Sequence, residues 1–142
     1  NLKFTANAKS ENDTKTVVSA RGFKMTIDEP ESLGVTNAGA NPVEFILAAL
    51  SGCLNVVGHL IAKEMGFSLR KLEIDLEGEL DPAKFMGQSE NGRAGYTSIT
   101  VTLRPDTDAD KNTLNTWLKK IESRCPVSDN ISNATPLKLI IG

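Results

Sequence analysis

A long apolar run in the first half of the chain constrains the fold more than any other feature. Asn41 is a good N-cap, Pro42 suits the first helical position, and Glu44 stands where the acid of a capping box is found. The sequence therefore predicts a helix from Asn41 to Met65 that is stopped by Gly66 and is about 38 Å long. Its residues are apolar on nearly every face, so every side needs cover. One thin sheet cannot supply that cover, and the pattern therefore predicts an oligomer.

The same run has to be weighed as a membrane span. From Phe45 to Ala62 no residue is formally charged, and about 18 apolar residues can suggest a transmembrane helix. The polar residues Ser51, Asn55 and His59 recur within the run, however, and its surroundings have the pattern of soluble amphipathic structure. We therefore expect a buried core helix and no membrane partner.

Composition limits the class of protein. A chain of 142 residues is long enough for one domain with a real core, and we expect a single domain over residues 1–142. The formal net charge of −2 implies no basic face and argues against a nucleic-acid partner. Two cysteines are too few for a secreted disulfide scaffold, and the first residues carry no charged-then-apolar signal pattern. We expect a cytoplasmic protein.

Alternating apolar and polar residues predict strands on both sides of the long helix. Before the helix they cover Leu2 to Ala6, Thr14 to Arg21 and Phe23 to Asp28, followed by a loop from Glu31 to Ala40 that is rich in Gly, Asn and small residues. After it, two more strands are centred on Leu72 to Leu76 and Ile99 to Leu103, on either side of a loop from Asp81 to Gly95.

The last third of the chain predicts a second helix with its own apolar stripe. Thr107 or Asp108 can cap it, and its stripe comprises Leu114, Trp117, Leu118 and Ile121. Cys125 and Pro126 then open a short helix, and residues 137–142, LKLIIG, are expected to close the chain as a strand. The order β-β-β-α-β-β-α-β, with this short helix before the last strand, indicates an α+β domain.

Residue counts exclude several kinds of chemistry. The chain has one histidine, His59, and no Cys-x-x-Cys pair, so neither a four-ligand zinc site nor a histidine-dependent triad is expected. No phosphate-binding or dinucleotide-binding glycine motif is present. We expect no metal and no cofactor, and we interpret His59 as a core histidine.

The two cysteines are the candidate reactive groups. Cys53 lies in the middle of the apolar run, where burial raises a thiol pKa unless a positive group compensates. Cys125 can begin the helix that follows it, whose free N–H groups favour a thiolate, and Arg124 is adjacent. These local signals favour Cys125 as the more acidic thiol. The sequence leaves open whether the two cysteines are incidental core residues or a dithiol that the fold brings together.

Three segments together resemble the OsmC/Ohr family. They are NPVEFILAALSGC, the CPV that precedes a helix in the second half, and the strand Phe23 to Asp28 before a Gly-bearing loop. That family consists of small thiol-dependent peroxidases that reduce organic hydroperoxides, together with uncharacterised OsmC-like relatives. The resemblance implies an OsmC-like fold, in which a long central helix is wrapped by an antiparallel-rich sheet. It also implies an intertwined homodimer with active sites at the subunit interface.

The resemblance assigns roles to both cysteines. It makes Cys53 the cysteine that attacks the hydroperoxide and Cys125 the resolving cysteine, with a lipoyl-type dithiol as the reductant. The implied activity is that of a cysteine-based organic hydroperoxide reductase in antioxidant defence. Glu44 is a weaker catalytic candidate, because characterised Ohr peroxidases place their glutamate at the position of Val43. A helix-capping role explains Glu44 at least as well.

A second difference from the family concerns the cation that activates the thiolate. The family supplies an arginine from its N-terminal hairpin, but the hairpin from Leu2 to Ala20 contains lysines and no arginine. Arg21, Arg93 and Arg124 are the nearest candidates, each from either subunit. Two other functions therefore remain in view: a small-molecule binding protein of the same fold, and a redox sensor that uses the dithiol without efficient peroxidase turnover.

Overall fold

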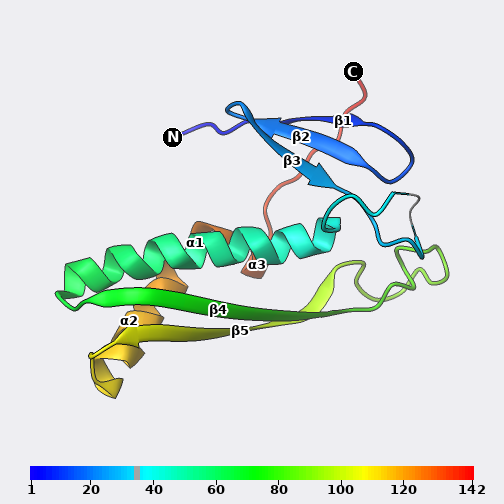
Figure 1. Ribbon diagram of the computed structural model, residues 1–142. Coiled ribbons are helices and arrows are strands. Elements are labelled where there is room, and N and C mark those ends of the chain that lie inside the picture. The colour runs from blue at the N-terminus through cyan, green and yellow to red at the C-terminus, as the bar shows by residue number, and fades with distance from the viewer. Residues whose placement is uncertain (34–35) are drawn as a thin grey trace. The chain divides into compact units, whose positions relative to one another are not determined.

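The computed structural model describes residues 1–33 and 36–142, which form two compact units, Asn1–Ala48 and Ala49–Gly142. The elements follow one another as in Figure 1: β1 (Asn7–Ser10), β2 (Thr16–Ala20), β3 (Phe23–Ile27), α1 (Pro42–Met65), β4 (Leu69–Leu80), β5 (Tyr96–Thr107), α2 (Lys111–Arg124) and α3 (Pro126–Ser132). The single domain over residues 1–142 stays a prediction.

The first unit contains a three-stranded antiparallel sheet in the order β1-β2-β3. The two-residue turn between β2 and β3 consists of Arg21 and Gly22, with φ of 52° and 84°, the combination that a tight hairpin turn requires. The two strands predicted around this turn are therefore confirmed, with slightly shorter bounds. The first strand begins only at Asn7, and Leu2 and Phe4 lie in an exposed segment without regular structure.

A buried carboxylate organises the end of this sheet. Asp28 is fully removed from solvent and accepts four hydrogen bonds. Its Oδ1 accepts from the Thr14 hydroxyl at 2.7 Å and from the Glu29 amide at 2.8 Å, and its Oδ2 accepts from the Ala38 amide at 3.0 Å and from the Thr36 hydroxyl. The predicted loop from Glu31 to Ala40 is thus tied back to β3, although its positions 34 and 35 lie outside the described residues.

The long helix begins and ends where the sequence predicts. The Asn41 amide donates to Glu44 Oε1 and the Glu44 amide donates to Asn41 Oδ1, both at 2.8 Å, which is a reciprocal capping box. At the other end, Gly66 has φ of 80° and donates to the Lys63 carbonyl, while Phe67 donates to the Ala62 carbonyl. This pair of hydrogen bonds is a Schellman motif, and it stops the helix at Met65.

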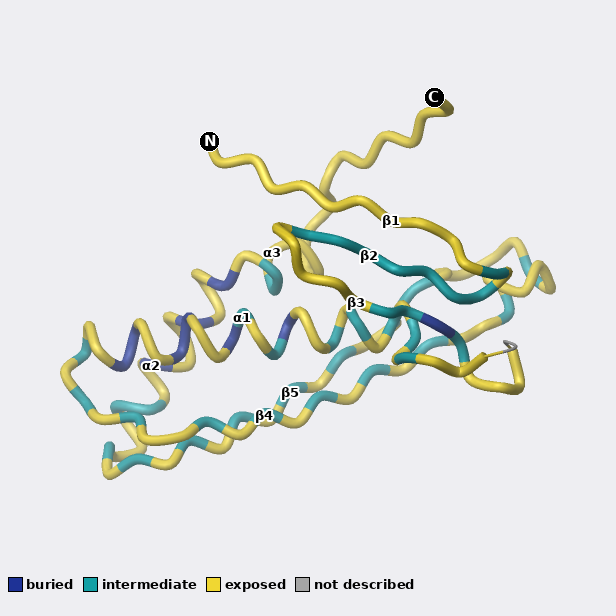
Figure 2. Tube along the Cα trace, turned by 45° about the horizontal axis from the view of Figure 1, so that its top comes forward, coloured by how far each residue is buried: buried dark blue, intermediate teal, exposed yellow. Residues whose placement is uncertain are grey.

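The second unit is built on the long antiparallel hairpin of β4 and β5, which pair from Leu69 with Thr107 to Leu80 with Tyr96. Along both strands, charged or hydroxyl side chains on the outer face alternate with partly buried apolar side chains on the inner face. The inner face packs against the core cluster, whose buried members are Leu50, Leu54, Val57, Ile61, Ala62, Trp117, Ile121 and Cys125. Figure 2 shows these buried segments along α1 and α2.

Two expectations for the last third of the chain are wrong. The N-cap of α2 is Asp110, which accepts from the Thr113 amide at 2.8 Å. Thr107 cannot cap α2 because it still pairs in β5 and donates to the Ser68 carbonyl, and Asp108 is ion-paired with Arg70. Residues 137–142 form no strand in this chain, and the apolar side chains Leu137, Leu139 and Ile141 are largely exposed.

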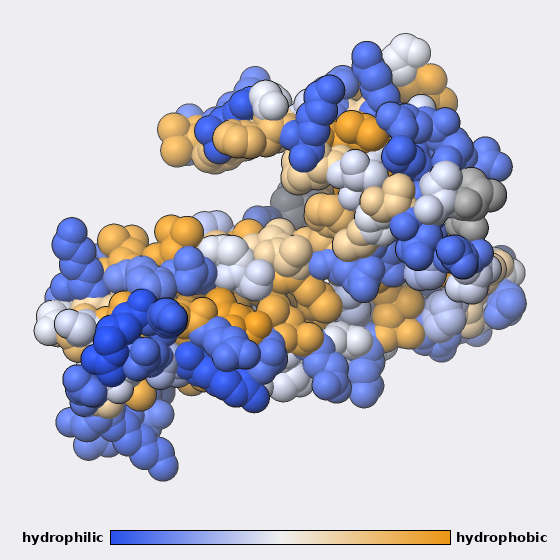
Figure 3. All heavy atoms as spheres, in the orientation of Figure 1, coloured by the Kyte–Doolittle hydropathy of each residue, from blue (hydrophilic) through white to orange (hydrophobic). Residues whose placement is uncertain are grey.

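One face of α1 is covered and the other is not. Leu54, Val57 and Ile61 are buried, whereas Val56 and Leu60 are 66% and 48% exposed. Apolar residues are accordingly visible on the surface along α1 in Figure 3. His59 lies on the uncovered side, and its Nδ1 is 2.9 Å from the Asn55 carbonyl. Our interpretation of His59 as a core residue is therefore wrong for the single chain.

Candidate functional site

The second unit brings the two cysteines together across 72 positions of sequence. Cys53 lies in the middle of α1 and is half-buried, and Cys125 lies between α2 and α3 and is 1% exposed. Their sulfurs are 2.9 Å apart, with the Cys125 thiol placed to donate to the Cys53 sulfur. Both thiols are free. A disulfide has a bond of about 2.05 Å, so only a small movement separates this dithiol from a covalent bond.

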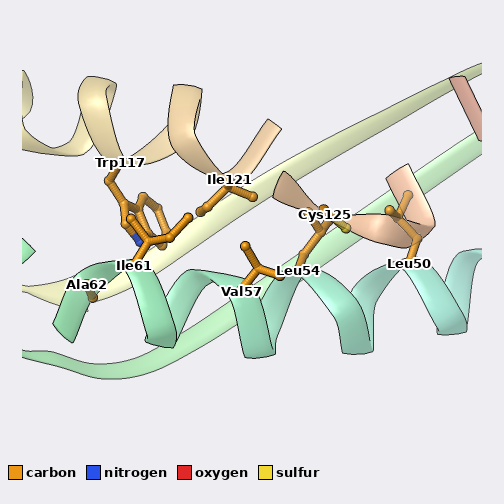
Figure 4. Close-up of a cluster of buried hydrophobic side chains, with 8 residues drawn as sticks. All are labelled: Leu50, Leu54, Val57, Ile61, Ala62, Trp117, Ile121 and Cys125. Atoms are coloured by element: carbon orange, nitrogen blue, oxygen red, sulfur yellow. The ribbon is translucent and has the colours of Figure 1, made fainter. Parts of the chain in front are cut away.

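Cys125 is fixed by the backbone on both sides of it. Its amide donates to the Ile121 carbonyl and so ends α2, while its sulfur accepts from the Ser128 amide at 3.4 Å and caps α3. Pro126 occupies the first turn of α3, where a missing N–H costs nothing. The predicted capping role of Cys125 is therefore confirmed. Figure 4 shows Cys125 facing α1 beside Leu54.

The prediction that Cys125 is the more acidic of the two thiols is wrong. Burial raises the pKa of the Cys125 thiol, and the hydrogen bond to Cys53 raises it further, while the Ser128 amide only partly opposes them. Removing a thiolate from water therefore outweighs the helix-end effect on which the sequence interpretation rested. Cys125 therefore holds its proton and is placed to donate it toward the Cys53 sulfur.

The candidate cations are not all free. Arg124 adjoins Cys125 in sequence, but its guanidinium binds the Glu64 carboxylate through Nη1 at 2.6 Å and Nη2 at 3.4 Å. This contact raises the pKa of Arg124 and lowers that of Glu64. Arg21, in the other unit, stacks over the Phe23 ring with 5.3 Å between guanidinium and centroid.

The contacts of Glu44 are with the start of α1 and not with the dithiol. Its carboxylate reaches the Asn41 amide, and the residue is exposed. The predicted capping box is therefore confirmed, and a catalytic role for Glu44 stays a prediction. Among residues 1–33 and 36–142, no group of three or more His, Cys, Asp or Glu side chains is arranged to hold a metal ion.

Two structural contacts, one in each unit, were missed in the sequence. The Trp117 indole donates from α2 to the Gly58 carbonyl in α1 at 2.8 Å, and Gly58 lies under the indole ring. The stripe of α2 predicts that Trp117 is buried, but no sequence signal names its acceptor. Asp28 was given only as the end of a strand, because its partners come from three separate segments.

Most of the chain matches a known protein family. The model of the OsmC-like protein family matches residues 35–140, and the chain belongs to that family. The predicted α+β, OsmC-like fold is confirmed. OsmC-like proteins are soluble. The length and composition of α1 would suffice for a membrane span, but the core helix of a soluble protein passes the same test.

Solved structures with this fold share little sequence with the chain. The OsmC-like protein of Mycoplasma pneumoniae superposes with a TM-score of 0.80 at 18% identity, covering 92% of this chain and 88% of that one. An organic hydroperoxide resistance protein OsmC of Legionella pneumophila gives 0.62 at 19%, covering 92% and 89%. The organic hydroperoxide resistance protein OhrB of Bacillus subtilis gives 0.59 at 18%, covering 90% and 89%. No curated protein matches the chain.

Proposed function

We propose that this protein reduces organic hydroperoxides with the Cys53–Cys125 dithiol, as a cysteine-based peroxidase in antioxidant defence. A redox role in general is supported by membership of the OsmC-like family and by structural neighbours named as organic hydroperoxide resistance proteins. The observation that carries the proposal is the separation of 2.9 Å between the two free sulfurs. Incidental core cysteines have no need of this contact.

The contact also supports an order for the two thiols. Cys125 is buried, has a raised pKa and is the donor of the shared hydrogen bond. Cys53 accepts that hydrogen bond and is the more accessible of the two. Cys53 is therefore the attacking residue, and Cys125 is the resolving residue.

The chemistry balances in two steps. The Cys53 thiolate attacks the outer oxygen of the hydroperoxide, the O–O bond breaks, and the alkoxide leaves as alcohol after taking a proton, which gives a sulfenic acid on Cys53. The Cys125 sulfur then attacks the Cys53 sulfur, and the hydroxyl leaves as water with the Cys125 proton. An external dithiol, which we take to be of the lipoyl type, reduces the resulting disulfide and is itself oxidised.

The surroundings of the dithiol favour an organic substrate. Cys53 packs against the apolar core cluster that contains Leu50, Leu54 and Val57. An alkyl group that is removed from water against such a surface contributes roughly 25 cal/mol per Å². Hydrogen peroxide gains nothing from this term, so bulky hydroperoxides should be the better substrates.

The active form that we propose is a cytoplasmic, intertwined homodimer. The uncovered face of α1, with Val56 and Leu60, and the exposed apolar side chains of residues 137–142 need a partner to cover them. A second copy supplies both surfaces at once. Sedimentation at micromolar concentration should give about twice the chain mass of 15.3 kDa, whereas a stable folded monomer would contradict the dimer.

A binding or redox-sensing protein without efficient turnover is the second candidate. Two observations favour it: Val43 stands where family peroxidases have glutamate, and the Arg124 guanidinium is engaged by Glu64. Both would leave the Cys53 thiolate with less help from charged neighbours. Slow or absent turnover, with ready dithiol–disulfide exchange, would establish this function instead.

Single serine variants and one pulse of cumene hydroperoxide test the proposal. The Cys125→Ser variant should trap a sulfenic acid on Cys53, detectable by a dimedone adduct in mass spectrometry. The Cys53→Ser variant should be inert, and the wild type should form a disulfide and release one alcohol per dithiol. Trapping on Cys125 would reverse the assignment, and no reaction in any of the three proteins would eliminate the peroxidase. Hydrogen peroxide at the same concentration is the matched control and should react more slowly.

A further inference from the structure

The buried part of the contact between α1 and α2 contains a directional bond. Trp117 is 2% exposed and donates its Nε1–H to the Gly58 carbonyl at 2.8 Å. Gly58 lies five positions after Cys53 in α1, and Trp117 lies eight positions before Cys125. This bond therefore links α1, which carries Cys53, to α2, which is followed directly by Cys125.

The indole ring is also held sterically. A Cβ placed on Gly58 would meet Trp117 Cζ2 and Leu72 Cδ2, each at 3.2 Å, so a larger residue there would require these side chains to move by a few tenths of an ångström. The indole also makes an edge-to-face contact with the Phe67 ring, with 6.2 Å between ring centroids and 78° between planes. The ring has a fixed place between α1 and the start of β4.

The Arg124–Glu64 ion pair also joins the two helices, but its side chains are 43% and 48% exposed and water screens them. The remaining buried contacts between the helices are apolar. Ile121 of α2 and Val57 and Ile61 of α1 share the core cluster, as Figure 4 shows. Apolar burial is non-directional, so it fixes the separation of two helices better than it fixes their position along each other's axis. A hydrogen bond depends on both distance and angle and does fix that position. A slip of one residue along a helix is about 1.5 Å, more than the sulfur contact can tolerate.

We propose that Trp117 is a positioning residue for the dithiol: its bond to the Gly58 carbonyl sets α2 along α1 so that Cys125 meets Cys53. The inference rests on the proposed function only in giving the two thiols a joint redox step. Trp117 touches neither substrate nor sulfur in this account, and it acts through the placement of α2. Loss of the bond should lower the effective concentration of one thiol at the other.

The test is a redox equilibrium that needs no hydroperoxide. The dithiol exchanges with oxidised glutathione, so that two protein thiols and one glutathione disulfide give the Cys53–Cys125 disulfide and two glutathione thiols. The oxidised fraction is counted by mass spectrometry after alkylation. In Trp117→Phe, which keeps a ring and loses the N–H, the equilibrium constant should fall about threefold to tenfold. A tenfold fall corresponds to about 30 mV for this two-electron couple.

A second variant perturbs the same contact from the other helix. Gly58→Ala keeps the carbonyl acceptor and favours the helix itself, but its methyl group would meet Trp117 and Leu72 at 3.2 Å, so we expect the indole to shift by a few tenths of an ångström. It should also lower the equilibrium constant, and it keeps the inference testable if Trp117→Phe does not fold. The matched control is Val101→Ala, which truncates a β5 side chain against the same core without touching the bond. It should change the equilibrium constant by less than about twofold, which is below the fall expected for Trp117→Phe.

The outcomes separate this inference from the proposed function. Unchanged constants in both helix variants, or an equal fall in Val101→Ala, would remove the positioning role, as would a wild type that forms no internal disulfide. A wild type that forms the disulfide but does not reduce cumene hydroperoxide would end the peroxidase proposal and leave the positioning role in place. Circular dichroism of each variant confirms that folded proteins are compared.

Discussion

Asp28 and Cys125 are both removed from solvent, yet the protein gives them opposite protonation. Asp28 is 0% exposed and its pKa is held well below the ordinary range, whereas Cys125 is 1% exposed and its pKa is raised. Burial by itself disfavours the charged form of both groups. The difference between them therefore comes from their neighbours.

The number of hydrogen-bond donors accounts for the difference. The Asp28 carboxylate accepts two hydroxyl and two amide donors, of which Thr36 contributes most to lowering its pKa. The Cys125 sulfur receives the Ser128 amide at 3.4 Å and stands against another thiol at 2.9 Å. Four short bonds overcome the cost of burial, and one long bond does not.

The comparison separates a structural anion from a reactive pair. The Asp28 charge is fully used in holding Thr14, Thr36 and Ala38 in place, so it has no capacity left for a substrate. The Cys125 proton, in contrast, is shared with a sulfur that can react. In this molecule the group with the more satisfied environment is the less reactive one.

The largest expected effect is a difference in alkylation between the two cysteines. Iodoacetamide at neutral pH should modify Cys53 at least about tenfold faster than Cys125, because only thiolates react and the pKa of Cys125 is raised. Peptide mapping by mass spectrometry gives both rates in one sample, and equal rates in strong denaturant are the control. Faster labelling of Cys125 than of Cys53 in the folded protein would contradict the conclusion that burial keeps the Cys125 thiol protonated.

A smaller effect is expected from neutralising the structural anion. Asp28→Asn replaces a pure acceptor by an amide that cannot accept at both ends, so donors among Thr14, Thr36 and Ala38 lose their partner. The midpoint of thermal unfolding at pH 7 should fall by several degrees. The Cys53–Cys125 equilibrium with glutathione should not change. A variant as stable as the wild type would show that the four bonds have no net value.

The pH dependence of the same pair of proteins follows from the direction of the shift. Because the folded pKa of Asp28 lies below its ordinary value of 3.8, its stabilisation is complete above that value and is lost as the pH falls below about 4. The wild type should therefore lose more stability than Asp28→Asn as the pH falls from about 5 to about 2, which is roughly the range in which a carboxylate takes up its proton. Other depressed carboxylates, such as Asp108 and Asp110, are common to both proteins and cancel in the difference.

Local signals in the sequence were sufficient for α1 and insufficient for its partners. The caps at Asn41 and Gly66 are encoded within a few residues, and the structure has both. The cap of α2 was misplaced by two or three positions because Thr107 and Asp108 are also plausible caps, and only their contacts with Ser68 and Arg70 exclude them. Competition for a polar side chain between distant segments leaves no periodic pattern.

The candidate site shows the same division. Spacing alone could not pair Cys53 with Cys125 across 72 positions, and the resemblance to a family suggested what the structure then placed at 2.9 Å. The prediction that Cys125 is the more acidic thiol was wrong, because the sequence indicates that a helix begins at Cys125 but does not indicate how deeply its thiol is buried. The strand expected at residues 137–142 has the correct alternation, but alternation does not name the neighbour that a strand requires.

The smallest expected effect concerns Glu44, an exposed carboxylate that contrasts with Asp28. Gln can serve as well as Glu in a capping box, so Glu44→Gln should leave the unfolding midpoint within about 2 °C of the wild type and hydroperoxide turnover within about twofold. Asn41→Ala is the matched variant, because it removes the cap itself and should cost about 1 kcal/mol. The two are compared by thermal unfolding and by steady-state reduction of cumene hydroperoxide. If Glu44→Gln abolished turnover at unchanged stability, Glu44 would have a catalytic role. The charge of this exposed carboxylate would then be needed for activity, in contrast to that of buried Asp28, which is needed for stability.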